Sequence, residues 1–296
     1  MITVGIVANR NKPRARPVVK AFVERLQEAQ ARVLYAAESA EFLKLAASEK
    51  TAALSELGHW CDVVVAFGGD GTLLTTACEV GASGVAILGV NLGSLGFLAE
   101  VKVEEIRETV QDLITGHYVI IERMVLAVRV HAADQIKNYW ALNDVVVDKG
   151  TSARLILIDA LVDGDYLNTY RSDGLIISTP TGSTAYSLSA GGPLLMPVMQ
   201  AIIVTPICPH SLTVRPIVLS ADSVLTISTR GKEKPVQVNI DGQNRFTIRA
   251  GDWLEISKAN YKVKWVSSNQ RDFFSILRTK LHWGIDLSTQ NPGAGG

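Results

Sequence analysis

The spacing of the apolar residues changes at Gly116, and this change constrains the possible folds more than any other feature of the chain. Up to that residue, short β-branched runs alternate with segments whose apolar residues recur at helical spacing. Strands are predicted at residues 2–8, 32–35, 62–67 and 85–90, and helices at 18–30, 42–57, 73–80 and 103–114. Such alternation is typical of a mostly parallel, Rossmann-like sheet covered by helices, so residues 1–116 are predicted to form an α/β domain.

The next 150 residues, 117–266, have a different pattern. They are rich in Val, Ile and Thr, they alternate with a period of two in several places, and Asp-Gly turn sequences recur. This pattern predicts an all-β, sandwich-like domain. Residues 267–296 contain an amphipathic helix at 270–282 and a Gly-rich tail. We expect the helix to return to the N-terminal domain and pack on it, and the tail to be flexible.

Composition excludes several classes of protein. The 296 residues suffice for two domains, and 29 basic residues balance 29 acidic ones. A neutral chain lacks the basic excess that non-specific binding to nucleic acid or anionic membranes requires. The sequence has no signal-peptide pattern, no long uncharged apolar stretch and no CxxC pair among its three cysteines. We expect a cytoplasmic protein with no membrane partner and no nucleic-acid partner.

A glycine loop directly follows the predicted strand at 62–67. Its sequence is Gly-Gly-Asp-Gly-Thr at 68–72, and a predicted helix comes next. Glycines let a ligand approach the backbone closely, and the N–H groups at a helix N-terminus favour phosphate. Gly68, Gly69 and Thr72 are therefore candidate phosphate-binding residues, with Asp70 as a carboxylate beside them. The alternative is a tight turn in which Asp70 only caps the helix. Neither GxGxxG nor GxxxxGK[ST] fits this loop.

Three further segments could bind a ligand. A second glycine loop at 91–97 follows the strand at 85–90 and adds Gly93 and Gly96 as phosphate-loop candidates. Asn143-Asp144 interrupts two strand-like runs, so it either marks a turn or presents polar groups to a ligand. The segment 179–193 is dense in hydroxyls and glycines, a composition suited to recognising ribose hydroxyls and phosphates.

Taken together, these motifs resemble those of the NAD kinase family. The resemblance rests on GGDGT at 68–72, NLGSLGF at 91–97, Asn143-Asp144, the run at 172–193, DGQ at 241–243 and the closing FFSILRTKLHWG at 273–284. They appear over nearly the whole chain in the family's order, and the bacterial form is the most similar. GGDGT is shared with diacylglycerol-type lipid kinases, whereas TPTGSTAYSLSAGGP is highly specific. The family often has Asn-Glu where this chain has Asn143-Asp144.

The resemblance implies ATP-dependent phosphorylation of the 2′-hydroxyl of the adenosine ribose of NAD, giving NADP. It also implies an active site between the two domains and a homodimer or homotetramer. Carried over by motif, Asp70 would be the general base or ribose anchor. The implied NAD-binding residues are Asp70, Gly71, Asn143, Asp144, Arg154, Arg171, Asp173, Thr184, Ala185, Tyr186, Ser187, Leu188, Ser189 and Gln243. Asp173 would lie near the nicotinamide end of a neighbouring subunit's site.

The residues themselves agree with phosphoryl transfer, which needs positioning and charge neutralisation more than covalent chemistry. ATP would be the donor, and a divalent metal ion, Mg²⁺, would be held mostly by phosphates and water because no cage of protein ligands is visible. Two alternatives remain open. One is a diacylglycerol-type lipid kinase that shares the GGDGT loop, and the other is a dinucleotide sensor without catalysis.

Overall fold

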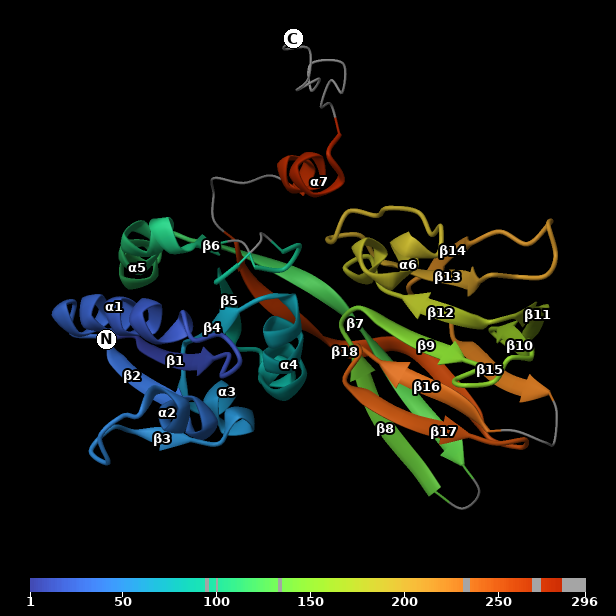
Figure 1. Cartoon of the computed structure of the whole chain (residues 1–296), viewed down its shortest axis with the longest axis horizontal. Coiled ribbons are helices and arrows are strands. Elements are labelled where there is room, and N and C mark those ends of the chain that lie inside the picture. The colour runs from blue at the N-terminus through green and yellow to red at the C-terminus, as the bar shows by residue number, and fades with distance from the viewer. Residues whose placement is uncertain (94–95, 100, 133–134, 231–234, 268–272, 284–296) are drawn as a thin grey trace, which may run out of the picture.

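The structure, a computed structural model, describes residues 1–93, 96–99, 101–132, 135–230, 235–267 and 273–283. Its N-terminal part is the predicted α/β domain (Figure 1). Parallel strands run in the order β5-β4-β1-β2-β3. The strands are β1 (Thr3–Ala8), β2 (Arg32–Ala36), β3 (Thr51–Ala52), β4 (Val63–Gly68), β5 (Ala86–Asn91) and β6 (Val101–Lys102). The helices are α1 (Ala15–Glu28), α2 (Ala37–Leu43), α3 (Leu57–Trp60), α4 (Asp70–Val80) and α5 (Ile106–Thr115).

Helices cover both faces of this sheet because its strands are apolar on both sides. Every residue of β4 and β5 is buried, as the continuous apolar runs at 62–67 and 85–90 predict. α1 and α5 pack on one face in a cluster that includes Phe22 and Phe67. α3 and α4 pack on the other face, where Leu57 and Leu73 are buried.

The helix predicted at 42–57 is wrong. α2 ends at Leu43, and Lys44 adopts a left-handed conformation with φ 58°. The chain then adds β3 to the edge of the sheet, pairing Tyr35 with Thr51. The Ala- and Lys-rich composition favours a helix locally, but pairing at the sheet edge outweighs that weak preference.

The C-terminal part is the predicted sandwich of two sheets. One sheet has the order β14-β13-β12-β9-β16-β17, and the other packs β11-β10-β15-β18 together with β7 and β8. Alternate residues of both sheets meet in one large apolar cluster. The strands are β7 (Val119–Ala132), β8 (Gln135–Ala141), β9 (Asp144–Asp148), β10 (Ile156–Val162), β11 (Asp165–Ser172), β12 (Gly174–Ser178), β13 (Ala201–Ile207), β14 (Ile217–Ser220), β15 (Leu225–Arg230), β16 (Val236–Ile240), β17 (Asn244–Ile248) and β18 (Trp253–Ser267).

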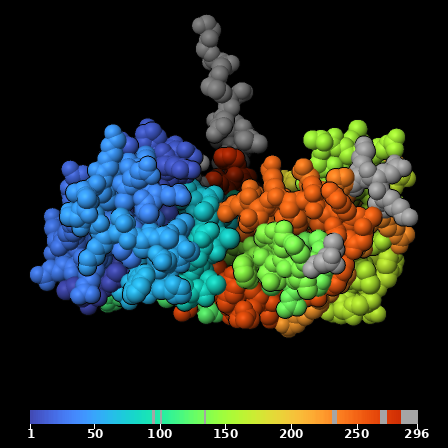
Figure 2. Space-filling view, turned by 90° about the horizontal axis from the view of Figure 1, so that it is seen from below, coloured from blue at the N-terminus to red at the C-terminus, as the bar shows by residue number. Residues whose placement is uncertain are grey.

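One long strand joins the two parts. β18 pairs with β15 and β7 inside the sandwich, and then Lys264 and Trp265 pair with Ala86 and Ile87 of β5. The twelve-stranded sheet therefore runs from the sandwich into the parallel sheet without a break. Figure 2 shows the N-terminal half, blue to cyan, lying directly against the C-terminal half.

Two short helices complete the described structure, α6 (Tyr186–Ser189) after β12 and α7 (Phe273–Leu281) near the C-terminus. Ile276 and Leu277 of α7 are buried, whereas Phe274 is 52% exposed. Figure 1 draws α7 outside both sheets, near the middle of the molecule. The surface that α7 covers stays a prediction, and the expected flexible tail lies outside the described residues. In the described part of the chain, no helix is long and apolar enough to cross a membrane.

Candidate active site

The carboxylate of Asp70 is held by the second glycine loop. Asp70 is the first residue of α4, directly after Gly69, and it does not cap its own helix. Its Oδ2 accepts the N–H of Phe97 at 3.0 Å, and its Oδ1 accepts those of Leu98 at 3.1 Å and Ala99 at 3.4 Å. The two glycine loops predicted to share one sheet edge therefore do meet, and the capping alternative is wrong.

Glycine is required at several positions of these loops for packing reasons. A Cβ on Gly96 would lie 1.9 Å from Oδ1 of Asp70, and a Cβ on Gly68 would lie 2.2 Å from Oγ1 of Thr72. By contrast, a Cβ on Gly69 or Gly71 would meet no protein atom within 4 Å. Gly69 and Gly71 thus leave open space beside Asp70, into which a ligand could reach.

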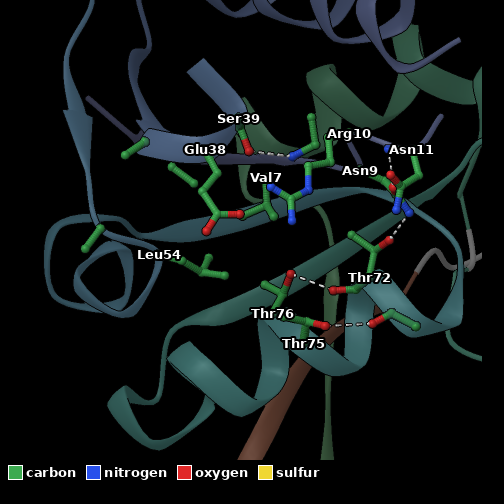
Figure 3. A pocket seen from close by; sticks show the side chains of 15 residues that line it. Val7, Asn9, Arg10, Asn11, Glu38, Ser39, Leu54, Thr72, Thr75 and Thr76 are labelled. Carbon is green, nitrogen blue, oxygen red and sulfur yellow. Dashed lines mark hydrogen bonds between the residues drawn. The ribbon is translucent and has the colours of Figure 1, made fainter. Parts of the chain in front are cut away.

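A cavity of about 500 Å³ opens at the carboxyl end of β1, beside the first two turns of α4. Figure 3 shows the side chains of Arg10, Glu38 and Thr75 around it. Asn9 donates from Nδ2 to Thr72 Oγ1 at 2.8 Å and so ties the loop after β1 to α4. The remaining lining residues are Val7, Ala8, Asn11, Ala36, Ala37, Ser39, Ala53, Leu54, Gly71 and Thr76. Gly93 of the second loop lies near the loop after β1, since a Cβ on Gly93 would be 3.5 Å from Lys12 Nζ.

Asn143-Asp144 forms the turn that leads into β9. The carboxylate of Asp241, in the turn between β16 and β17, accepts the backbone N–H groups of Leu142, Asn143 and Asp144 at 2.7, 2.8 and 2.9 Å. Asp144 is 6% exposed. Burial, and secondarily the charge of Asp241, raise the pKa of Asp144 to about 7. Burial also raises the pKa of Asp241, although its three N–H donors oppose that shift.

This turn and α4 lie in the same part of the molecule. Leu73 and Leu74 of α4 share one buried cluster with Leu142, the residue before Asn143. Cys78, one turn beyond Leu74 on α4, lies close enough to Asp241 for the Asp241 charge to raise the pKa of the thiol, after burial and the charge of Glu79. The packing therefore brings the helix that begins with Asp70 alongside the Asn143-Asp144 turn.

The hydroxyl- and glycine-rich segment packs on the other side of the same turn. Thr179 donates from Oγ1 to the Leu142 carbonyl at 2.5 Å and from its backbone N–H to the Asn143 carbonyl at 2.9 Å. A Cβ on Gly182 would lie 2.1 Å from the Asn143 carbonyl oxygen. Ser187 faces the sandwich, where its Oγ is 3.0 Å from Thr205 Oγ1.

The residues around Ser187 are more open. Tyr186 and Ser189 are exposed, and Thr184, Ala185 and Leu188 are half-buried. Burial raises the pKa of the Tyr186 phenol, and the nearby charges of Asp148, Cys208, Asp173 and Asp144 raise it further. Asp173 is itself paired with Lys149 at 2.5 Å.

Two of the remaining predicted residues, Arg154 and Arg171, stand apart from this group. Arg171 is exposed on β11, at the edge of the twelve-stranded sheet, and Arg154 is exposed in the segment before β10. Gln243 is exposed in the turn that also carries Asp241. Within the described single chain, no hydrogen bond joins Arg154 or Arg171 to the Asp70 and Asp144 region.

Several residues that organise the site were not among the sequence candidates. Asp241, Thr179 and Leu98 all act through backbone contacts, and Trp265 donates from Nε1 to the Leu98 carbonyl at 3.1 Å. The Asp241-Gly242 turn sequence and the hydroxyl-rich run that begins at Thr179 were the sequence signals for this set. No group of three or more His, Cys, Asp or Glu that could hold a metal ion occurs in the part of the chain that the structure describes.

The comparisons with known proteins agree with this arrangement. The sequence model of the ATP-NAD kinase N-terminal domain matches residues 4–118, and that of the ATP-NAD kinase C-terminal domain matches residues 142–268. The chain belongs to the NAD kinase family. It is 43% identical to an NAD kinase of Geotalea daltonii over 96% of this chain and 99% of that one. It is 42% identical to an NAD kinase of Desulforamulus reducens over 97% of this chain and 100% of that one.

Solved structures of the family share the whole fold. A yeast NADH kinase complexed with NADH has a TM-score of 0.89 and 27% identity, over 98% of this chain and 90% of that one. An NAD kinase from Archaeoglobus fulgidus in complex with ATP has a TM-score of 0.76 and 23% identity, over 95% and 99%. The likeness to the second structure concerns the fold alone. The predicted fold class, an α/β domain followed by a β-domain, is confirmed.

Proposed function

We propose that this chain transfers the γ-phosphate of ATP to the 2′-hydroxyl of the adenosine ribose of NAD, producing NADP. The observation that carries the proposal is the Asp70 carboxylate at the start of α4, held by three backbone N–H groups. The Asn143-Asp144 turn, held by Asp241, packs along the same helix through Leu142. A hydroxyl bound at Asp70 would be oriented without any rearrangement of that carboxylate, and positioning is the main requirement of phosphoryl transfer.

In this proposal Asp70 orients the ribose hydroxyl and receives its proton. A carboxylate has about four acceptor positions, and three N–H donors to Asp70 leave one for the hydroxyl. The open space at Gly69 and Gly71 supports an approach from that side.

The NAD pocket is proposed to lie between α4, the Asn143-Asp144 turn and the 184–189 segment. Asn143 and Asp144 would hold the adenosine, and the half-buried or exposed groups of Thr184, Ala185, Tyr186 and Ser189 would line the pocket. Ser187 and Leu188 would support it from behind, since Ser187 bonds to Thr205. Arg154, Arg171, Asp173 and Gln243 would serve the nicotinamide end, with a contribution from a neighbouring subunit in a homodimer or homotetramer.

The cavity beside the first turns of α4 supports a position for the ATP donor. Its volume of about 500 Å³ suits a nucleotide, and Arg10, Asn9 and Thr72 offer groups for phosphates. Gly68, Gly93 and Gly96 would shape the phosphate loops. A Mg²⁺ ion would neutralise charge on the ATP oxygens. It would keep mostly phosphate and water ligands, because Glu38 supplies the carboxylate of the cavity lining and the described residues contain no group of three or more His, Cys, Asp or Glu that could hold a metal ion. We place the reaction in the cytoplasm.

Production of NADP tests the function directly. The purified chain is incubated with NAD, ATP and Mg²⁺, and NADP is then measured with a dehydrogenase specific for NADP. NADP formation that requires ATP supports the proposal. Binding of NAD without turnover would favour the dinucleotide sensor, and phosphorylation of diacylglycerol in vesicles would favour the lipid kinase.

Asp70→Asn tests the assigned role of the carboxylate. Since an amide cannot accept the hydroxyl proton, we expect kcat to fall by about 10²–10⁴-fold, the usual contribution of a positioned base, with only a modest rise in the KM for NAD. Asp62→Asn is a matched control, because Asp62 also accepts a backbone N–H, that of Thr3 at 2.7 Å, but at the opposite end of β4. A kcat near that of the unmodified protein in Asp70→Asn would contradict the role.

A further inference from the structure

Asp241 makes an unusual number of backbone contacts for one side chain. It has φ 52° in the Asp241-Gly242 turn, a left-handed conformation that Asp and Asn tolerate better than most residues. Its Oδ2 accepts the Leu142 N–H, its Oδ1 accepts those of Asn143 and Asp144, and its own N–H donates to the Asp144 carbonyl at 3.0 Å. Four hydrogen bonds thus fix three consecutive residues to one aspartate.

The opposite side of these three residues is also fixed through the backbone. Thr179 bonds to the carbonyls of Leu142 and Asn143, and Gly182 packs directly against the Asn143 carbonyl. None of these contacts uses the side chain of Asn143 or Asp144. The segment is therefore rigid, while its two polar side chains take no part in holding it.

This arrangement is costly for stability alone. It brings the carboxylate of Asp144, which is buried, close to that of Asp241, which is half-buried, and like charges oppose each other there. A neutral acceptor could hold part of the same turn without that repulsion. Costly polar arrangements of this kind are expected where function, rather than folding, selects the residues.

We propose that Asp241 is a positioning residue for the phosphoryl-transfer reaction, a role that rests on the function proposed above. Its carboxylate fixes the backbone of Leu142, Asn143 and Asp144, and it thereby aims the side chains of Asn143 and Asp144 at the substrate. Asp241 itself acts through this backbone and does not touch the reacting atoms.

The charge of Asp241 gives the proposal a second readout. The charge of Asp241 raises the pKa values of Asp144, of Cys78 in α4 and of Tyr261 in β18. The charges of Asp144, Asp148, Asp173 and Cys208 raise the pKa of the Tyr186 phenol in α6. The pKa values of Cys78, Tyr186 and Tyr261 are all raised, so these groups stay neutral near pH 7. Replacing Asp241 by a neutral residue therefore removes a negative charge beside Asp144, and the pKa of Asp144 falls.

The test is Asp241→Asn beside a matched control, Asp163→Asn. Asp163 also has φ 52° in an Asp-Gly turn, it accepts the Val224 N–H at 2.8 Å, and its N–H donates to the Val224 carbonyl at 2.9 Å. Val224 and Asp163 lie beside β10 and β15, away from α4. In Asp241→Asn, the new amide N–H₂ would face one of the three N–H donors, which loosens the turn.

Three measurements are made on both variants: kcat/KM for NAD across pH, NAD binding by calorimetry, and hydrogen exchange of the amides of residues 142–144. For Asp241→Asn we expect faster exchange at these amides and a loss of about 10²-fold in kcat/KM, typical of a misplaced group. The limb of the pH profile that reports Asp144 moves to lower pH. Asp163→Asn leaves the pH profile, kcat/KM and the exchange at 142–144 unchanged.

The outcomes separate this inference from the proposed function. If the unmodified chain makes no NADP, the function fails, and the exchange data still decide whether Asp241 holds the segment. Unchanged exchange and kcat/KM in Asp241→Asn, or equal losses in Asp163→Asn, overturn the positioning role. If Asp241→Asn does not fold, Asp241→Gly replaces it, because glycine accepts φ 52° and adds no opposing donor. Failure of both variants to fold overturns the proposal in favour of a purely structural role.

Discussion

At the scale of single residues, the buried carboxylate of Asp144 links pH to stability. Burial and the charge of Asp241 raise its pKa from 3.8 to about 7. In the unfolded chain the Asp144 carboxyl ionises near its ordinary pKa of 3.8. Between that pH and about 7, the carboxyl is therefore more often protonated in the folded state than in the unfolded state. The free energy of unfolding therefore decreases as pH rises through this window.

Asp144→Asn removes this dependence. Compared with the unmodified protein, the variant should gain stability between pH 5 and pH 7 at a slope of up to about 1 kcal/mol per pH unit. The check is urea unfolding of both proteins at several pH values. A stability difference that stays constant across the window, or that changes in the opposite direction, contradicts the assignment of a raised pKa to Asp144.

Gly96 shows how closely the second glycine loop approaches Asp70. A methyl group at this position would overlap Asp70 Oδ1 at 1.9 Å, so Gly96→Ala must displace the carboxylate or the loop. We expect a lower free energy of unfolding and a lower kcat. Gly71→Ala is the contrast: its methyl group meets no protein atom, and alanine should stabilise α4 by up to about 1 kcal/mol. If Gly96→Ala has the same free energy of unfolding as the unmodified protein in urea, the close contact between Gly96 and Asp70 Oδ1 is wrong.

The residues of the site were predictable only where a local pattern marked them. Gly68–Thr72 and Asn143-Asp144 stand out because glycines follow a buried strand and polar residues interrupt strand-like runs. The run at 179–193 marks the region of Thr179 but not its bonds to Leu142 and Asn143, and Leu98 carries no mark at all. They act through backbone groups whose partners are distant in sequence, and a one-dimensional pattern contains no information about those partners.

At the scale of secondary-structure elements, β18 supports the Asp70 region through Trp265, which lies in the same buried cluster as Leu73 and Leu74 of α4. Trp265 is fully buried, donates to the Leu98 carbonyl, and lies 5.5 Å from the Arg123 guanidinium. The N–H of Leu98 in turn donates to Asp70. One residue of the loop thus connects the tryptophan of β18 to the carboxylate at the start of α4.

Trp265→Phe keeps an aromatic ring and removes the indole donor. The Leu98 carbonyl then loses a buried partner, so we expect the free energy of unfolding to fall by about 1–3 kcal/mol and kcat to fall with it. Trp60→Phe is the control, since Trp60 is 68% exposed. Equal effects of the two substitutions, measured by urea unfolding and NADP production, would remove β18 from the support of Asp70.

The elements were predictable where burial, rather than composition, set the pattern. The apolar runs that became β4 and β5 are unambiguous because both faces of these strands are covered. The Ala- and Lys-rich segment after Leu43 gave the wrong prediction. Its pairing with the edge strand β2 is a contact between separate segments, and no helix-breaking signal in the segment indicates it. Helix propensity alone does not contain that contact.

At the scale of the whole molecule, the change in sequence pattern at Gly116 marks a change of architecture within one continuous sheet. The pattern predicts two halves because parallel and antiparallel strands differ in periodicity. It does not predict that β18 leaves the sandwich to pair with β5. That pairing involves only Lys264 and Trp265, which are too few residues to change the periodicity of the segment.

The pairing of β18 with β5 also has a consequence for synthesis. A ribosome releases the chain from the N-terminus, so β5 is complete long before Lys264 and Trp265 emerge. Until then, part of one edge of the parallel sheet has no strand beside it, and unpaired edges of growing chains invite association with other chains. The nascent α/β half is therefore expected to need shielding, by a chaperone or by the ribosome itself, until Lys264 and Trp265 have been translated and can pair with β5.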